Sequence, residues 1–201
     1  MTETQKTKAV TWEELQDMET LFKDKRSLAL YSLYTKIPPR RVQDYRLMKI
    51  GKDVDDNFNY LDLVSDPEGL EESNLIYNKY KTSDRKGYGQ YISKIPEDLE
   101  TILKEYVKEH NLEDGDFLFY SNPSGTLKTK NRSYASHAFS RVVSDIFLKI
   151  GKKVDANAIR HAYATHVLKD RISQTELQKV ATAMGTSRSA LHDIYNKLDL
   201  E

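Results

Sequence analysis

The segment VDANAIRHAYATHVL places an arginine where an apolar helix is expected. Ile159, Tyr163 and Val167 recur at helical spacing, so Arg160 stands in a helix whose apolar stripe should be buried. A guanidinium in such a helix needs a partner, and a carboxylate of the same domain is the simplest one. Its planar set of N–H donors also suits the oxygens of a phosphate group.

A second candidate for chemistry lies in the closing segment MGTSRSALHDIYNKLDL. Tyr195 is one of 13 tyrosines in the chain, so its residue type alone does not separate a packing role from a reactive one. A phenol with a pKa of about 10 is a weak nucleophile. Its attack on a phosphodiester requires neutralisation of the phosphate charge and removal of the phenolic proton.

The basic residues that such chemistry needs are unevenly distributed. The net charge is zero, from 31 basic and 31 acidic residues, which alone counts against a nucleic-acid binder. Residues 36–52 carry six basic groups and the single acid Asp44, whereas residues 53–72 carry eight acids and no base. Residues 79–94 hold five basic groups, and residues 95–118 hold eight acids and two lysines. These blocks fit either ordinary solvated faces or a bipolar surface with one face attractive to phosphate.

The composition excludes several classes of protein. No apolar run approaches the roughly 20 residues of a membrane span, and no secretory signal is visible, so we expect a protein inside the cell without a membrane partner. The cytoplasm, the nucleus and a viral factory all fit the sequence equally well as the compartment of this protein. The chain has no cysteine, and its five histidines form no metal-binding pattern, so we expect neither a metal nor another cofactor.

The elements that position these residues are mainly helical. The capping box TWEE opens a first helix at Thr11, along which Leu15, Met18, Leu21 and Phe22 follow at helical spacing. The apolar segment SLALYSLYT forms a second helix that the IPPRR prolines must end. RRVQDYRLMKI then restarts a helix, which places Arg40 and Arg41 at a loop-to-helix junction. Toward the other end of the chain, we expect helices over residues 131–149, 155–169, 173–184 and 188–198, the third of which begins with a capping box in SQTE.

Residues 58–95 change to the pattern of short strands. FNYLDLV, NLIYNKYKT and GQYISKIP are rich in Tyr, Ile, Leu and Val and are separated by turn clusters, which predicts a three-stranded antiparallel sheet. A helix opened by Pro96 and an extended segment, FLFYSNPSG, should follow. The predicted fold class is therefore α+β and mainly helical, with a flexible tail over residues 1–10 and one domain over residues 11–201.

Together, and in this order, the segments resemble the catalytic domain of the tyrosine recombinase, or phage-type integrase, family. The resemblance covers about residues 11–199. IRHAYATH is similar to the family pattern Leu-Arg-His-x-Phe-Ala-Thr-His and is the most specific match. MGTS resembles the Leu-Gly-His-Ser box, and the spacing from that box gives the role of nucleophile to Tyr195. The resemblance implies a helical catalytic domain with a small sheet, as in type IB topoisomerases.

The resemblance also marks the other site residues. RVQDY resembles the pattern Arg-x-Ser-Glu-Leu, which makes Arg41 the first arginine and Arg40 its close rival. The lysine that the family carries in a strand hairpin resembles Lys81, with Lys79 and Lys86 as alternatives.

The implied activity is cutting and rejoining of duplex DNA through a 3′-phosphotyrosyl intermediate, without a metal or nucleotide cofactor. Two arginines would neutralise the phosphate, the lysine would protonate the departing 5′ oxygen, and the tyrosine would attack. The implied partners are double-stranded DNA and other copies of the chain, as a tetramer on DNA. We expect no N-terminal DNA-clamping domain, and the IPPRR and MGTS variants look more like those of eukaryotic viruses and mobile elements.

Two positions depart from the family pattern. The family usually has histidine or lysine three residues before the second arginine, and this chain has Asn157, which cannot act as a base. Thr186 replaces the box histidine and keeps a single hydroxyl donor. Both changes should reduce the rate of DNA cleavage.

Three histidines are candidates to accept the phenolic proton of Tyr195, and His192 is the most plausible of them. His161 and His166 lie near the second arginine, and His192 lies three positions before the tyrosine, on the same face of a helix. The competing hypotheses are a type IB topoisomerase and a catalytically weakened recombinase kept as a DNA-binding module.

Overall fold

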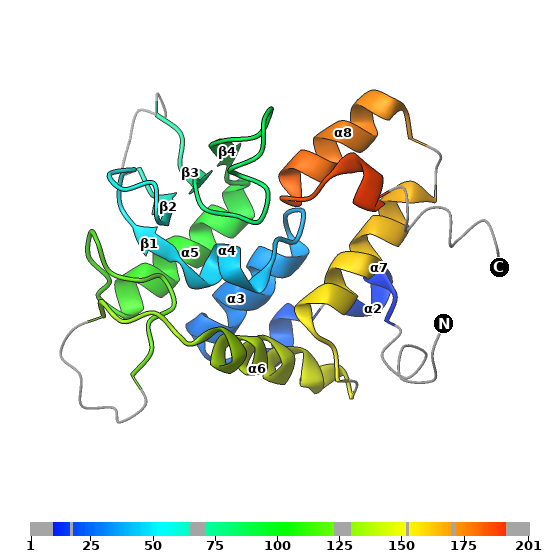
Figure 1. Ribbon diagram of the computed structural model, residues 1–201. Coiled ribbons are helices and arrows are strands. Elements are labelled where there is room, and N and C mark those ends of the chain that lie inside the picture. The colour runs from blue at the N-terminus through cyan, green and yellow to red at the C-terminus, as the bar shows by residue number, and fades with distance from the viewer. Residues whose placement is uncertain are drawn as a thin grey trace. The chain divides into compact units, whose positions relative to one another are not determined.

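The computed structural model describes residues 10–16, 18–64, 71–122, 130–151, 153–169 and 172–191. Figure 1 shows its helices and one small sheet, which in chain order are α2 (Trp12–Leu15), η1 (Glu19–Leu21), α3 (Lys25–Thr35), α4 (Val42–Arg46), β1 (Met48–Ile50), β2 (Asn59–Asp62), β3 (Asn74–Tyr77), β4 (Tyr91–Lys94), α5 (Glu97–Glu109), α6 (Ser136–Phe147), η2 (Leu148–Ile150), α7 (Ala156–Leu168) and α8 (Gln174–Ala183). The predicted tail and most of the predicted helix 188–198 lie outside the described residues.

The chain divides into two compact units. Unit 1 comprises residues 1–41 and 140–201, and unit 2 comprises residues 42–139. Unit 1 contains α2, α3, α7, α8 and most of α6. Unit 2 contains α4, the sheet and α5.

The helices of unit 1 begin where the sequence supplies caps. Thr11 and Ser173 form the two predicted capping boxes, each with a glutamate three residues later, and Asp155 caps α7. On α3, Tyr31 and Tyr34 are buried, and their ring centroids lie 5.8 and 6.1 Å from that of Phe147. α7 and α8, yellow and orange in Figure 1, bury a shared apolar cluster of Ala164, Leu168, Leu177, Ala181, Met184 and Leu191.

The predicted first helix is interrupted after one turn. α2 ends at Leu15, and only the short η1 follows before α3. The prediction of one continuous helix from Thr11 through Phe22 was therefore wrong. The reason is a buried phenol at the break: the Tyr31 hydroxyl donates to the Leu15 carbonyl (2.9 Å) and accepts from the Met18 N–H (3.1 Å). The backbone groups that a continuing helix would have paired are thereby satisfied by a side chain.

α2 and α7 are joined by aromatic and ionic contacts. The rings of Trp12 and Tyr163 meet edge to face at 5.0 Å, and Glu13 Oε1 lies 3.0 Å from His166 Nδ1. A hydrogen bond from its own backbone N–H, and then the contact with His166, hold the pKa of Glu13 down to about 2, below its ordinary value of 4.5.

Replacing His166 with alanine will raise the pKa of Glu13 only part of the way toward 4.5, because the backbone contribution is the larger one. An NMR titration of the carboxyl group measures the change, and Lys169→Ala is the control with a smaller shift. Because the folded pKa lies below the unfolded one, the linked stability is present above pH 4.5 and is lost as the pH falls toward 2. A return to the full ordinary value in the His166 variant would contradict this ordering.

Within the described residues, the sheet of unit 2 has four strands in the order β1-β2-β3-β4. β2, β3 and β4 form the predicted antiparallel pairs, but β1 adds a parallel strand, with Met48 opposite Asn59. The prediction of three strands and of a helix through RRVQDYRLMKI was therefore wrong. α4 stops at Arg46 because the following residues alternate: Met48 and Ile50 are buried, and Lys49 between them is not.

Hydrogen bonds connect this sheet to an extended segment and to α5. The predicted extended segment FLFY lies beside β1, where the Leu118 N–H donates to the Met48 carbonyl at 2.9 Å. Pro96 occupies the N-cap position of α5, one residue before its expected place. Ser73, next to β3, donates to the Glu100 carboxylate of α5 at 2.7 Å. No helix within the described residues is long and apolar enough to cross a membrane.

Candidate functional site

The MGTS segment forms the C-terminal end of α8. Gly185 has a φ of 61°, in the left-handed region that favours glycine. Its N–H donates to the Thr182 carbonyl at 3.0 Å, and the Thr186 N–H donates to the Ala181 carbonyl at 2.9 Å. This is the hydrogen-bond pattern of a Schellman motif, which ends a helix by turning the chain sharply. The glycine of the box thus terminates α8.

Arg40 binds the carbonyls at this helix end. Its Nε donates to the Ala183 carbonyl at 2.9 Å, and its Nη2 donates to the Thr182 carbonyl at 3.1 Å. The side chain is only 1% exposed. A cation is favoured here because the last carbonyls of a helix carry a partial negative charge.

Arg160 connects the same helix end to the IPPRR loop. Its Nη1 donates to the Met184 carbonyl at 2.8 Å and to the Pro39 carbonyl at 2.9 Å. These partners are main-chain carbonyls, whereas a carboxylate was the simplest expectation from sequence. We call Arg40, Arg160 and the four carbonyls they bind, those of Pro39, Thr182, Ala183 and Met184, the arginine–carbonyl cluster. It joins the loop, α7 and the box inside unit 1.

Arg41 differs from both of these arginines. Its side chain is half-buried, and its Nε is buried without a hydrogen-bond partner in the part of the chain that the structure describes. An unsatisfied donor of this kind costs about 1–3 kcal/mol, or more when charged. The half-buried side chain of Arg41 is also more accessible to a ligand than that of Arg40, which is almost fully buried. Of the two neighbouring arginines, Arg41 is therefore the better candidate to bind a phosphate group.

The positions that depart from the recombinase pattern lie in contrasting environments. Thr186 is 5% exposed, whereas Asn157 is exposed in the first turn of α7. His161 is exposed on the same helix, and His166 contacts Glu13. Tyr195 and His192 lie outside the described residues.

Lys81 stands in the segment between β3 and β4, in unit 2. It is exposed within a turn at residues 81–84. Of the two alternatives, Lys79 reaches Asp84, with Nζ 3.4 Å from Oδ2, and Lys86 is exposed. The contact of Lys79 with an acid leaves Lys81 and Lys86 as the better candidates for the predicted lysine.

One residue that the sequence patterns did not mark, Asn59, holds the start of this lysine-bearing segment. It is fully buried, and its amide bonds to the backbone of Asn78 and Lys79. The available signal was an asparagine inside the apolar run FNYLDLV, because asparagine is depleted in strands.

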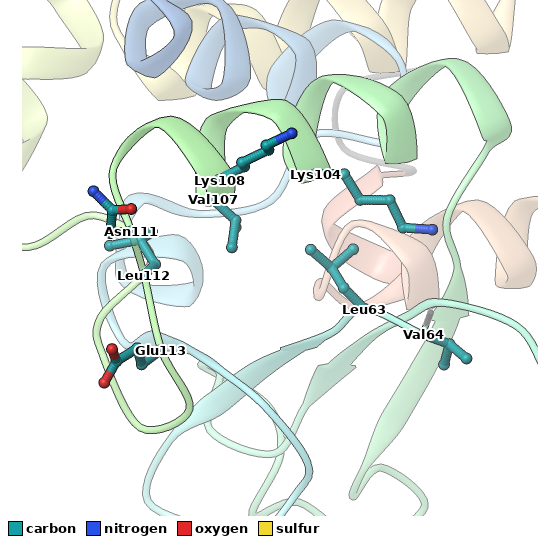
Figure 2. Close-up of a pocket in the computed structure, with 8 residues that line it drawn as sticks. All are labelled: Leu63, Val64, Lys104, Val107, Lys108, Asn111, Leu112 and Glu113. Carbon is teal, nitrogen blue, oxygen red and sulfur yellow. The ribbon is translucent and has the colours of Figure 1, made fainter. Parts of the chain in front are cut away.

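Unit 2 also has an open groove of about 550 Å³. Figure 2 shows its lining: α5 supplies Lys104, Val107 and Lys108, the turn after it supplies Asn111, Leu112 and Glu113, and Leu63 and Val64 follow β2. None of the residues that the sequence marks for chemistry lines this groove.

Comparisons with known proteins identify the fold. No protein family model matches the sequence, and no curated protein matches it. Among solved structures, the crystal structure of XerA recombinase matches with a TM-score of 0.61 and 22% identity, over 93% of this chain and 57% of that chain.

Two complexes of XerH site-specific recombinase also match. The pre-cleavage complex with difH substrate has a TM-score of 0.60 and 18% identity, over 94% of this chain and 50% of that one. The post-cleavage complex with palindromic difH has a TM-score of 0.61 and 17% identity, over 96% and 50%. The chain spans about half the length of these recombinases. At such identities the likeness is one of fold, and it confirms the predicted α+β fold of a tyrosine recombinase catalytic domain.

Proposed function

We propose that this chain is the catalytic part of a site-specific DNA recombinase or integrase, which cuts and rejoins duplex DNA through a tyrosine. One observation carries the proposal: hydrogen bonds join the IPPRR loop, the α7 arginine and the MGTS box in a fold shared with site-specific recombinases. XerH of the same fold is seen bound to its difH substrate before and after cleavage, which supports DNA as the substrate class.

The proposed step is an exchange of ester bonds at phosphorus. The Tyr195 hydroxyl oxygen forms a bond to the scissile phosphorus, and the bond from phosphorus to the 5′ oxygen breaks. The phenolic proton passes to water or to one of the candidate histidines, His161 and His192. The ammonium of Lys81 gives a proton to the departing 5′ oxygen, so a free 5′ hydroxyl and a 3′-phosphotyrosyl link result.

The arginines act on the charge of the phosphate. Arg41 supplies a donor that the described protein groups leave unpaired. Arg160 is bonded directly to the MGTS box, through the carbonyl of Met184. Fixed cationic donors stabilise the extra negative charge of the pentavalent transition state without reorganising. The reverse step, attack by a different 5′ hydroxyl, joins new strands because the phosphodiester energy is kept in the tyrosyl link.

Trapping of a covalent adduct tests this function. The probe is a pool of nicked duplexes of randomised sequence, labelled at the 5′ end of the cut strand, from which the short 5′-hydroxyl fragment diffuses away. The wild-type protein will form a labelled adduct that survives SDS. Tyr195→Phe will form none, because it lacks the attacking oxygen, and Tyr120→Phe serves as the matched control that keeps the adduct.

The alternative functions give different results in the same assay. The burial of Thr186 favours a DNA-binding module without activity, because a buried hydroxyl is poorly placed to donate to a phosphate. DNA binding by the wild type with no adduct on any duplex would establish that module and refute catalysis. An adduct that rejoins only its own strand, and never an added 5′-hydroxyl strand, would instead indicate a topoisomerase of type IB. Assembly into a tetramer on DNA is part of the recombinase proposal and is measured by sedimentation with and without duplex.

A further inference from the structure

The segment from Asn78 to Gln90, which we call the lysine loop, is closed at its base by side chains. Gln90 Nε2 donates to Asn78 Oδ1 at 2.9 Å, so the two ends of the loop are bonded directly. Both amides also donate to one carboxylate: Asn78 Nδ2 to Asp53 Oδ1 and Gln90 Nε2 to Asp53 Oδ2, each at 2.6 Å. The loop thus starts and ends at one polar junction.

Asn59 fixes the first residues of the loop to the sheet. Its Oδ1 accepts from the Asn78 N–H (2.9 Å) and the Lys79 N–H (2.8 Å). Its Nδ2 donates to the Lys79 carbonyl (3.1 Å) and to the Asp44 carbonyl (2.7 Å), which belongs to α4. A side-chain amide has two donors and two acceptor positions, so these four bonds use its whole capacity. The side chain is 0% exposed, and water does not compete for these bonds.

The loop between these anchors is itself ordered by internal bonds. The Tyr80 hydroxyl donates to the Gly89 carbonyl at 2.7 Å, and the Ser83 hydroxyl donates to the Tyr80 carbonyl at 2.9 Å. Tyr80, Thr82 and Ser83 are buried, whereas Lys81 between them is exposed. The backbone on both sides of Lys81 is therefore fixed, and the lysine is the residue presented outward.

We infer that Asn59 is a positioning residue for the DNA-cleavage step, holding the backbone from which Lys81 protonates the departing 5′ oxygen, with Asn78, Gln90 and Asp53 closing the loop behind it. The inference rests on the proposed function. It assigns Asn59 a role that is more specific than stability, since two of its four bonds go to Lys79 N–H and C=O, two residues before the proton donor. A proton donor displaced by about 1 Å loses much of its effect, because general acid catalysis depends on hydrogen-bond reach.

A change of leaving group separates positioning of the acid from general damage. A duplex with a 5′-bridging sulfur in place of the scissile 5′ oxygen expels a thiolate. Because thiols are far more acidic than alcohols, with a pKa of about 8.5 for the cysteine side chain, the thiolate leaves without being protonated. We expect Asn59→Ala to slow adduct formation on the ordinary nicked duplex by about 100-fold, the lower end of a general-acid contribution. On the sulfur duplex, adduct formation should be almost as fast as with the wild type.

Two further variants separate loss of positioning from loss of folding. Gln90 is exposed, so Gln90→Ala opens the base of the loop without a change in the core, and it should show the same preference for the sulfur duplex in weaker form. Asn57→Ala is the matched control, because this exposed asparagine bonds only to Asp55 among the described contacts and should behave as the wild type.

The outcomes distinguish this inference from the function on which it rests. Equal slowing on both duplexes, or unchanged rates in Asn59→Ala and Gln90→Ala, would overturn the positioning role while wild-type adducts still support recombination. Failure of the wild-type protein to form an adduct on either duplex would overturn both. Selective recovery of the Asn59 and Gln90 variants on the sulfur duplex supports the inference.

Discussion

Arg41→Ala will slow formation of the covalent adduct by roughly 100- to 1000-fold, the effect of removing one donor from a charge-stabilising site. Thermal unfolding should change little, because the Nε of this arginine has no partner among the described residues, so its loss leaves no described group unsatisfied there. Single-turnover kinetics on the nicked duplex and a thermal melt of the same preparation measure the two effects separately.

Arg41→Lys is the informative companion variant. Lysine keeps the positive charge and loses the planar set of donors, so DNA binding should persist while cleavage stays well below that of the wild type. Full activity of Arg41→Ala, with a large drop in its melting temperature, would show that the roles of the two adjacent arginines are the reverse of those proposed.

Arg40→Ala should have the opposite profile and be the more damaging of the two to the fold. Two partly buried carbonyls at the end of α8, those of Thr182 and Ala183, would lose a charged donor. The Thr182 carbonyl would keep its bond from the Gly185 N–H, whereas the Ala183 carbonyl would keep no partner among the described contacts. We expect a loss of roughly 3 kcal/mol in the free energy of unfolding, from two charge-assisted hydrogen bonds and one newly unsatisfied acceptor. For a chain of this size the melting temperature would fall by roughly 6–12 °C.

The control for this prediction keeps the volume of the side chain. Arg40→Met retains an apolar stem and removes the donors, so it should recover the packing part of the loss but not the hydrogen-bonding part. Urea unfolding of the three proteins measures the difference. A melting temperature equal to that of the wild type in Arg40→Ala would mean that the carbonyls find other partners, and the cluster would not hold the box in place.

Features encoded by neighbouring residues were the ones that could be predicted. The capping boxes at Thr11 and Ser173 depend on residues three apart, and the strands β2, β3 and β4 on short apolar runs between turns. β1 was missed because three residues are too few to show a period, and the preceding turn of helix extended the apparent pattern. The interruption after Leu15 depends on Tyr31, 16 residues away, and no local pattern contains it.

The candidate site shows the same division. Arg160 was marked by its apolar surroundings, and the box by its resemblance to Leu-Gly-His-Ser. The resemblance ranked Arg41 ahead of Arg40, but the different contacts of the two arginines could not be read from local sequence, because the partners of Arg40 lie 142 and 143 residues away. Asn59 was not predicted as a site residue for a related reason. Three of its four bonds go to the start of a loop about 20 residues later, and only its unusual place in a strand indicated a role.

The burial of Thr186 bears on how such a box can evolve. This position follows directly on the left-handed glycine, in a turn packed against α8, and it is 5% exposed. A histidine, the residue of the family pattern, is much larger, and forcing extra volume into a packed site costs about 1–3 kcal/mol. A change from threonine to histidine at this position would therefore require smaller neighbouring side chains. The size of residue 186 and the packing of the turn around it depend on each other, so a change in one is tolerated only with a change in the other.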